Sequence, residues 1–422
     1  MKELRFCFLT TFYPPYNFGG DGIAVQRLAR ALVRAGHRVT VVHDVDAWRL
    51  LGGRSDLPAG EDDGVEVISL RSRMGSLSPL LTQQFGIPVA HGRRIRRLIE
   101  ERDADVVHFH NVSLVGGPAL LRAGQNSIRL YTAHEHWLVC PMHVLWRHNR
   151  EPCTGRECVR CTLAHRRPPQ LYRVTGAMQR SFREVDTFIA LSEFSRQKHA
   201  EFGFGPSMEV MPNLVPAPQG APSAARTELP VHEETGRPFF LFAGRLERLK
   251  GLDEVIQVFE RFPDVDLVIA GEGGHEAALQ AIPTPNSNVR FVGRVSSFAL
   301  GQLYGRAAGL IAPSIGFETF GLILVEAMSH GTPVLARDSG PFPEIVNTSG
   351  AGLLFQDGDS LAAGIDALID PQRHSDLSAR ALAAYATHWG EDVVLERYFE
   401  IIESTARQSG REELAVALGG AG

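Results

Sequence analysis

Short apolar stretches alternate with helix-like stretches along the whole chain, and this alternation constrains the fold more than any other feature. In the first half, strand-like runs lie at 4–10, 39–43, 65–70, 106–110 and 128–132. Amphipathic helices are expected between them, for example over 23–35. The second half repeats the pattern, with strand-like runs at 239–244, 267–274, 289–295 and 309–312. The alternation predicts an α/β fold built from βαβ units and parallel sheets.

The length of 422 residues is too great for one ordinary core and predicts two domains of about 200 residues each. We place the first domain at 1–215 and the second at 216–390, with a crossover helix and tail at 391–422. The helix is expected from about His388 to Ala406. The linker is expected within 212–238, where six prolines occur without any periodicity.

Composition and charge predict a cytoplasmic globular enzyme. The chain is 44% hydrophobic and 22% charged, no run of about 18 apolar residues occurs, and the N-terminus reads as a first strand rather than a secretory signal. Residues 1–215 carry 28 Lys and Arg against 21 Asp and Glu, whereas residues 216–422 carry 15 against 27. The basic half would suit an anionic acceptor or peripheral association with the inner membrane face, and an ordinary solvated surface is the alternative. No nucleic-acid partner is expected.

Two glutamates in the stretch 313–336 are the leading site candidates. Glu326 lies in an apolar helix, where a carboxylate is costly to desolvate unless it is paired or contacts the hydroxyls of a ligand. Glu318 lies in the loop before that helix, whose free amides favour a bound anion such as a sugar phosphate. The alternative for the pair is a structural salt bridge and an ordinary loop carboxylate.

Two cations follow the first strand of the second half. Arg245 and Lys250 lie in a Gly-bounded loop that leads into a helix. A forked guanidinium and a point-charge ammonium beside a helix N-terminus form a receptor for a diphosphate. A lone pair of this kind is usually surface charge, but Glu318 and Glu326 in the same half favour function.

These motifs resemble the donor site of retaining glycosyltransferases of family 4, the group that includes glycogen synthases and mannosyltransferases. Glu318 and Glu326 are separated by seven residues and followed by Ala-Met and Gly-Thr-Pro-Val, and 242–251 matches the Gly-Arg-(four residues)-Lys-Gly pattern. The resemblance implies a GT-B fold, in which two Rossmann-like domains face each other across a cleft. It also implies that Glu326 binds the ribose of a nucleotide, and that Glu318, with the backbone near Phe320 and Gly321, binds the transferred sugar.

The first half carries a weaker version of the same resemblance. Gly19 and Gly20 match the family's Gly-rich loop, which lines the cleft and reaches the transferred sugar. His110, at the second position of His-x-His, matches a histidine that hydrogen-bonds the donor sugar. Thr132 and His134 follow the next strand-like run and are acceptor-side candidates. Without the resemblance, a plain turn and a core histidine would be the preferred interpretations.

Four of the five cysteines, Cys140, Cys153, Cys158 and Cys161, fall within a segment of about 140–165. Disulfides are disfavoured in the cytoplasm, and Cys-x2-Cys suits tetrahedral zinc. The cluster therefore predicts a structural zinc site, and iron–sulfur ligation and free thiols are the alternatives. Some family members carry a comparable insertion. No cofactor is expected to take part in catalysis.

Together these features predict a retaining, metal-independent glycosyltransferase that moves a sugar from a UDP- or GDP-linked donor to a hydroxyl acceptor. Arg245 and Lys250 would stabilise the leaving diphosphate, and His110 and Glu318 would orient the sugar. A saccharide or lipid-linked acceptor in envelope polysaccharide or glycolipid synthesis is the first expectation. The alternatives are glycosylation of a secondary metabolite, a GT-B nucleotide-sugar epimerase, or a non-catalytic scaffold.

Overall fold

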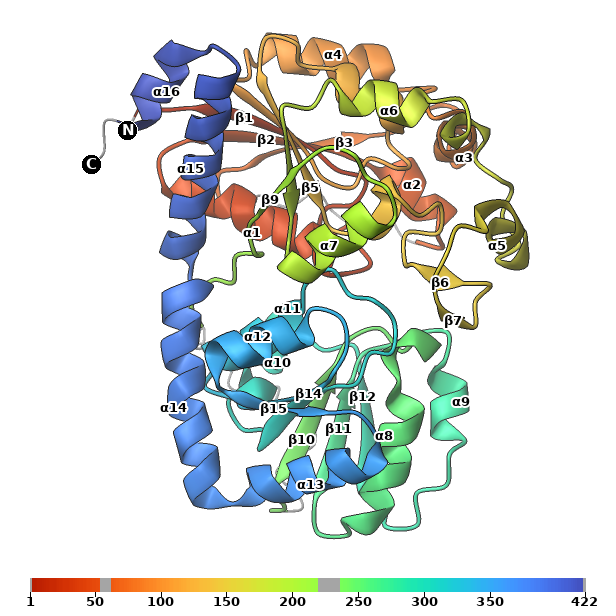
Figure 1. The fold of residues 1–422 in the computed structure, drawn as a ribbon, viewed down its shortest axis with the longest axis vertical. Helices are drawn as coiled ribbons and strands as arrows, with labels where there is room; N and C mark the ends of the chain where they lie inside the picture. Colours follow the sequence, from red (N-terminus) through yellow and green to blue (C-terminus); the bar gives the residue numbers. More distant parts are fainter. Residues whose placement is uncertain (1, 54–61, 219–235, 420–422) are drawn as a thin grey trace. The chain divides into compact units, whose positions relative to one another are not determined.

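The protein is represented by a computed structural model that describes residues 2–53, 62–218 and 236–419. It consists of two compact units (Figure 1). Residues 1–214 and 394–422 form the first unit, and residues 215–393 form the second. Most of the expected linker, residues 219–235, lies outside the described residues.

The first unit is built on a parallel sheet of seven strands in the order β3-β2-β1-β4-β5-β8-β9. The strands are β1 (Arg5–Leu9), β2 (Arg38–Asp44), β3 (Glu66–Leu70), β4 (Val106–Phe109), β5 (Ile128–Ala133), β8 (Thr187–Ala190) and β9 (Met208–Val210). The chain runs outward from β1 through β2 to β3 and then returns to β4 on the other side. The carboxyl ends of β1 and β4 therefore flank the point where the strand order reverses, which is where open α/β sheets bind ligands.

Helices cover both faces of this sheet. Their bounds are α1 (Gly20–Arg34), α2 (Val45–Leu50), α3 (Leu77–Phe85), α4 (Gly92–Glu101), η1 (Pro118–Arg122), η2 (His136–Leu138), α5 (Cys158–Ala164), η3 (Leu171–Arg173), α6 (Ala177–Phe182), α7 (Glu193–Glu201), α15 (Glu391–Gln408) and α16 (Glu412–Gly419). Apolar residues of α1 and α15 share one buried core with the sheet, and those of α4, η1 and α6 share the other. The unit is thus doubly wound, as the alternation of apolar stretches predicts.

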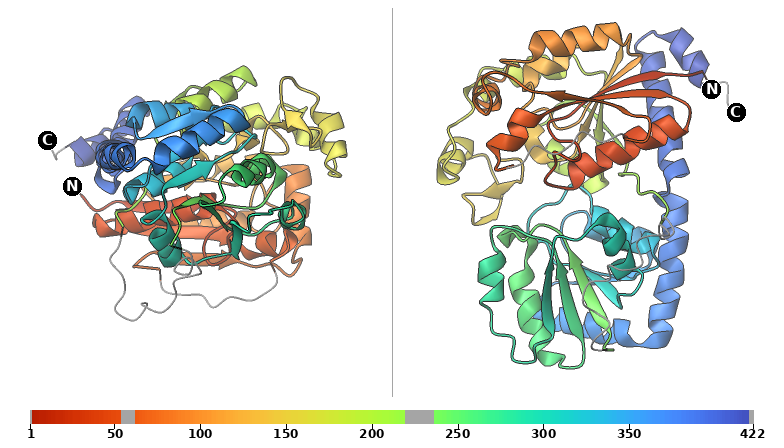
Figure 2. Two further views of the ribbon diagram at one scale, coloured as in Figure 1. Left: turned by 90° about the horizontal axis from the view of Figure 1, so that it is seen from below. Right: turned by 180° about the vertical axis from the view of Figure 1, so that it is seen from behind.

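One extension projects from the sheet of the first unit. It contains the antiparallel hairpin of β6 (Trp146–Arg147) and β7 (Glu151–Pro152), followed by α5. All views place it at the edge of its unit (Figures 1 and 2). This extension corresponds to the Cys-rich segment.

The second unit has a parallel sheet of six strands in the order β12-β11-β10-β13-β14-β15. The strands are β10 (Phe239–Ala243), β11 (Asp266–Ala270), β12 (Val289–Gly293), β13 (Gly309–Ala312), β14 (Val334–Arg337) and β15 (Gly352–Phe355). The helices are η4 (Arg248–Lys250), α8 (Leu252–Val258), η5 (Phe259–Arg261), α9 (Glu276–Gln280), α10 (Ser297–Tyr304), α11 (Leu322–Ser329), α12 (Phe342–Ser349), α13 (Gly358–Ile369) and α14 (Pro371–His388). The strand order reverses between β10 and β13, so this sheet also has a ligand-binding edge at that point.

The helix expected from His388 to Ala406 is divided differently in the structure. The carbonyl of Tyr385 accepts hydrogen bonds from the amides of both Trp389 and Gly390, which ends α14, and α15 then begins at Glu391. The buried residues of α15 include Val394, Tyr398 and Ile402, which pack on the sheet of the first unit. In the described part of the chain, no helix is long and apolar enough to cross a membrane.

Candidate functional site

The loop between β10 and α8 is fastened to the end of β13. Gly251 has φ 69°, and a Cβ at this position would lie 2.4 Å from the carbonyl oxygen of Pro313. A side chain is therefore excluded both by backbone conformation and by the close approach of the two loops. This arrangement holds Lys250 beside the loop that carries Ser314 and Glu318.

Lys250 and Glu318 form the centre of this site. The Nζ of Lys250 donates to Oε1 of Glu318 at 2.6 Å, and the hydroxyl of Ser314 donates to the same oxygen at 2.9 Å. Burial alone would raise the pKa of Glu318, but the charge and hydrogen bond of Lys250 outweigh it and leave the pKa below its usual value. Glu318 is therefore an anion at neutral pH, and Lys250 is positioned by it.

Arg245 lies close to this pair and remains accessible. Its guanidinium is paired with Glu247 at 2.8 Å, and its side chain is 55% exposed. Little free energy is needed to move this guanidinium away from Glu247, since exposed ion pairs contribute at most about 1 kcal/mol. Arg245 and Lys250 thus supply two cations at the reversal point of the second sheet.

Glu326 accepts a hydrogen bond from a tyrosine. The hydroxyl of Tyr304, at the end of α10, donates to Oε2 of Glu326 at 3.0 Å. Glu326 is half-buried in α11, so the helix does not enclose it as fully as its apolar neighbours in the sequence suggest. Phe320 and Gly321, at the start of this helix, are buried. Tyr304 was not identified from the sequence, and nothing in its local pattern distinguishes it from a core aromatic residue.

The first unit gathers three histidines near the carboxyl ends of β4 and β5. Nδ1 of His110 lies 3.0 Å from Nε2 of His134. His108 bonds the hydroxyl of Thr132 through Nε2 and that of Tyr398 through Nδ1, each at 2.8 Å. Burial lowers the pKa of His108, His110 and His134. The three imidazoles are therefore neutral at neutral pH.

One ring nitrogen of His110 is buried without a hydrogen-bond partner in the described part of the chain. Its side chain is buried, and its Nε2 has no hydrogen-bond partner among the residues that the structure describes. A narrow hollow in the same unit is lined by His110, Thr132 and His134 together with Met211, Pro212 and Asn213. Thr132 lines this hollow, and its hydroxyl is hydrogen-bonded to His108.

Gly19 and Gly20 lie at the start of α1, three residues earlier than the predicted helix. Gly19 is the N-cap, and its amide donates a hydrogen bond within the loop to Oδ1 of Asn17 at 3.3 Å. Gly20 is exposed. The tightly packed glycine is instead Gly22, where a Cβ would lie 2.5 Å from Oδ1 of Asn17.

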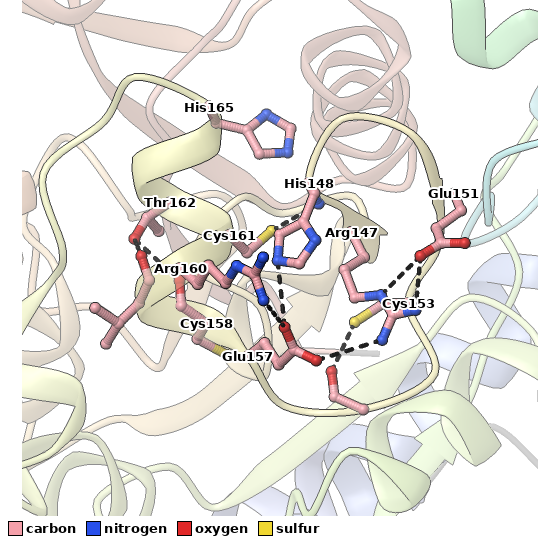
Figure 3. Close-up of polar contacts among 12 residues, drawn as sticks. Arg147, His148, Glu151, Cys153, Glu157, Cys158, Arg160, Cys161, Thr162 and His165 are labelled. Atoms are coloured by element: carbon pink, nitrogen blue, oxygen red, sulfur yellow. Dashed lines mark hydrogen bonds and ion pairs between the residues drawn. The ribbon is translucent and has the colours of Figure 1, made fainter.

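The four clustered cysteines are all free thiols, and Figure 3 shows three of them, Cys153, Cys158 and Cys161. Sγ of Cys161 accepts from the amide of His148 at 3.3 Å, and Sγ of Cys153 lies 3.1 Å from the carbonyl oxygen of Gly155. Within 2–53, 62–218 and 236–419, these thiols do not form a group of three with ligand atoms inside 4.8 Å of one another. Glu157 occupies the middle of the segment, where it pairs with Arg147, His148 and Arg160. The structure thus brings the cysteines into one extension without closing a metal shell.

Comparison with known proteins agrees with this architecture. The model for Glycosyltransferase Family 4 matches residues 18–219, and the model for Glycosyl transferases group 1 matches residues 226–389. A GDP-mannose-dependent monoacylated alpha-(1-6)-phosphatidylinositol monomannoside mannosyltransferase from Corynebacterium glutamicum is 31% identical over 53% of this chain and 64% of its own length. The match therefore spans less than two thirds of that relative. A phosphatidyl-myo-inositol mannosyltransferase from Mycolicibacterium smegmatis is 27% identical over 87% of this chain and 86% of its own length.

Solved structures show the same fold at low sequence identity. Sucrose-phosphate synthase from Thermosynechococcus elongatus superposes with a TM-score of 0.71 at 18% identity, covering 95% of this chain and 99% of its own. Anabaena HepE in complex with UDP and glucose superposes with a TM-score of 0.66 at 19% identity, covering 95% of this chain and all of its own. The chain therefore has a GT-B fold and is a homologue of the family 4 and group 1 glycosyltransferases.

Proposed function

We propose that the protein is a retaining glycosyltransferase that moves a sugar from a UDP- or GDP-linked donor to a hydroxyl acceptor, without a catalytic metal. The observation that carries the proposal is the grouping of Arg245, Lys250 and Glu318 where the strand order of the second sheet reverses. Two cations and an ionised carboxylate at such an edge suit a diphosphate joined to a polyhydroxyl group.

In this proposal the diphosphate is the leaving group. Lys250 leaves Glu318 and, with Arg245, binds the phosphate oxygens, whose negative charge grows as the glycosidic bond breaks. Glu318 then accepts hydrogen bonds from hydroxyls of the transferred sugar, and Glu326 accepts those of the ribose. Because two side-chain cations neutralise the leaving group, the reaction has no need for a divalent ion there.

His110 would bind the transferred sugar through Nε2. A neutral imidazole can donate or accept a hydrogen bond without placing a full charge beside the sugar. The sequence contains no carboxylate pair at a clear nucleophile spacing, so the proposed chemistry is a same-face displacement. In that step the leaving phosphate accepts the proton of the acceptor hydroxyl, the donor's sugar–oxygen bond breaks, and the new glycosidic bond forms on the same side.

A lipid-linked acceptor with peripheral membrane association is supported by an exposed apolar surface on the first unit. We call this surface the α3 patch, and its exposed members are Leu77, Leu80, Phe85, Ile87, Leu171 and Val174. The two parts of the patch adjoin, since a Cβ on Gly86 would lie 2.8 Å from the ring of Tyr172. Helix α4 follows directly, and it exposes Arg93, Arg94, Arg96 and Arg97 while burying Ile95, Leu98 and Ile99. Helix α4 would therefore contribute charge, and the α3 patch would contribute apolar contact.

The two mannosyltransferase relatives are named for phosphatidylinositol-based acceptors, which supports the same class of acceptor. A small secondary metabolite would also suit an apolar surface and is the second candidate. Sedimentation with anionic vesicles separates the two, because Leu80→Ser combined with Phe85→Ser would abolish membrane binding only if the α3 patch contacts lipid.

We also propose that the cysteine extension holds structural zinc. Burial, and to a lesser degree the nearby Cys153 and Cys161, raise the pKa of the Cys158 thiol, and Cys140 lies in the same segment. Closure of the shell requires the ion pairs of Glu157 to rearrange. Zinc analysis of the purified protein tests this, since Cys158→Ser with Cys161→Ser should lower the zinc content by one equivalent. Visible absorption would instead reveal an iron–sulfur cluster.

The experiment that tests the transferase proposal is calorimetric titration with UDP, GDP, ADP and TDP, with and without EDTA. We expect one nucleotide to bind in both conditions and to bind less tightly to Glu326→Ala. Glu260→Ala is the matched control, because Glu260 is exposed in the same unit and loses the same charge. Binding that requires a divalent ion, or that is unchanged in Glu326→Ala, would contradict the proposal. Incubation with the sugar nucleotide alone, followed by analysis of its C2 configuration, separates a transferase from an epimerase.

A further inference from the structure

A second group of buried polar side chains lies in the first unit, apart from the residues used above. Asp44 is the last residue of β2, Asp46 is in the first turn of α2, and His91 precedes α4. Their exposed fractions are 1%, 1% and 4%. One potential ligand atom from each residue lies within 4.8 Å of the others, although the three positions span 47 residues of sequence.

Part of the hydrogen-bonding capacity of these residues is used locally. Oδ1 of Asp44 accepts from the amides of Asp46 at 2.9 Å and Ala47 at 3.3 Å, which caps α2. Oδ2 of Asp46 accepts from the amide of Ser72 at 2.7 Å. These bonds fix the orientation of both carboxylates.

The remaining atoms are left without partners. Oδ2 of Asp44, Oδ1 of Asp46 and Nε2 of His91 have no hydrogen bond to any described residue. Nε2 of His91 lies 4.0 Å from Oδ2 of Asp46, which is beyond hydrogen-bonding distance. No Lys or Arg of the described chain forms an ion pair with either carboxylate. Three unpartnered polar atoms in one buried space are costly unless a ligand satisfies them.

We propose that Asp44, Asp46 and His91 form a binding site for a divalent transition-metal ion. Two carboxylates and one imidazole are hard and borderline ligands, a set that suits zinc, cobalt or manganese better than calcium or magnesium, which prefer oxygen alone. The hydroxyl of Ser72 is also buried without a partner, and it adjoins Asp46 through its own amide. Ligand atoms up to 4.8 Å apart would need to approach by up to about 1.4 Å, because metal–ligand bonds of about 2.0–2.2 Å place neighbouring ligands roughly 3.4 Å apart.

The site would be structural. It joins the end of β2, the start of α2 and the start of α4, so an ion there would hold the base of the arginine-rich helix α4 against the sheet. The proposal does not depend on the proposed transfer reaction, since none of its residues belongs to the donor site or the histidine group. The competing occupant is a proton: burial and the carboxylate of Asp46 raise the pKa of Asp44 to about 7.

The test uses the full chain with Cys158→Ser and Cys161→Ser as the background, so that the cysteine extension does not contribute metal. The apo protein, prepared with EDTA and then dialysed free of it, is titrated with Co²⁺. We expect one bound equivalent, absorption from d–d transitions without thiolate-to-cobalt charge transfer, and a higher midpoint of thermal unfolding. An excess of Ca²⁺ should not displace the Co²⁺, because calcium is a poor partner for imidazole.

His91→Gln and Asp46→Asn should each lose the bound equivalent and the thermal shift. His388→Gln is the matched control, because His388 is exposed in the second unit, and it should bind Co²⁺ as the background does. If the background protein binds no Co²⁺, or if His91→Gln and Asp46→Asn both retain it, the metal site is wrong and Asp44 carries a proton instead. Circular dichroism spectra of the apo variants show whether a loss of Co²⁺ binding results from misfolding. If Asp46→Asn is misfolded, Co²⁺ binding by His91→Gln, which preserves both carboxylates, decides whether the site exists.

Discussion

The ion pair of Lys250 and Glu318 predicts that removal of its two members affects nucleotide binding in different ways. In the structure, Nζ of Lys250 is 2.6 Å from Oε1 of Glu318, and the side chains are 23% and 32% exposed. In the proposed mechanism, Lys250 leaves Glu318 to bind the diphosphate. Glu318→Gln therefore frees the lysine, whereas Lys250→Met removes it.

The sizes of both effects follow from this geometry. A hydrogen bond to a charged group contributes about 1.5–3 kcal/mol, so Lys250→Met should weaken binding of UDP or GDP by about 10- to 150-fold. A half-exposed ion pair is worth about 1 kcal/mol. Glu318→Gln should therefore leave nucleotide affinity unchanged or raise it up to about fivefold. The same variant should slow sugar transfer at least about tenfold, because a contact to the transferred sugar is lost.

Calorimetry with the nucleotide that binds the wild-type protein measures the affinities, and initial rates measure transfer. Urea unfolding provides the structural control, and we expect Lys250→Met to lower the free energy of unfolding by about 2 kcal/mol, between the values for exposed and buried pairs. If Glu318→Gln weakens nucleotide binding as much as Lys250→Met does, the pair acts as one structural unit and the reasoning is refuted.

Three further perturbations follow from the same structure. The pKa of Glu318 is lowered in the folded state, so its contribution to stability should be complete above about pH 4.5 and lost as pH falls through the lower folded value. In Glu318→Gln, the free energy of unfolding in urea should therefore depend less on pH in this range. An unchanged pH dependence would contradict the prediction. Burial lowers the pKa of His134 from 6.5 to about 4. Between these values His134 is protonated in the unfolded chain but not in the folded one, so the free energy of unfolding should fall as pH drops below 6.5, by up to about 2 kcal/mol at pH 5. His134→Gln should reduce that loss. Tyr398→Phe removes the hydroxyl that is hydrogen-bonded to His108 and should lower the free energy of unfolding by about 1 kcal/mol. Tyr385→Phe, which loses a hydrogen bond to the carbonyl of Val215, should lower it by a similar amount and serves as the comparison.

The sequence predicted the fold well because strand and helix periodicities are local properties. Apolar runs such as 106–110 and 267–271 became buried strands, and the GT-B architecture is confirmed by the solved structures it matches. Boundaries were less well predicted. The start of α1 at Gly20 and the break at Trp389 depend on individual backbone bonds, which periodicity does not encode.

The candidate donor residues were also identified from the sequence, since Arg245, Lys250, Glu318 and Glu326 lie in recognisable motifs. Their partners were not. Tyr304 is 22 residues from Glu326, and Tyr398 is 290 residues from His108. A tyrosine in an amphipathic pattern looks the same whether its hydroxyl meets water or a buried imidazole.

The sequence by itself determined the α/β class, the division into two domains, and the residue types available for a phosphate-binding and sugar-binding site. Only the tertiary structure decided which of these side chains meet, because the parallel strand order places loops far apart in sequence at one edge of a sheet. It paired Lys250 with Glu318, left Nε2 of His110 buried and without a hydrogen-bond partner among the described residues, and bonded the hydroxyl of Thr132 to His108. It also brought together Asp44, Asp46 and His91, whose spacing in the sequence carries no recognisable signal. Charge, burial and hydrogen bonding depend on distances in space, and those distances exist only once the sheets have formed.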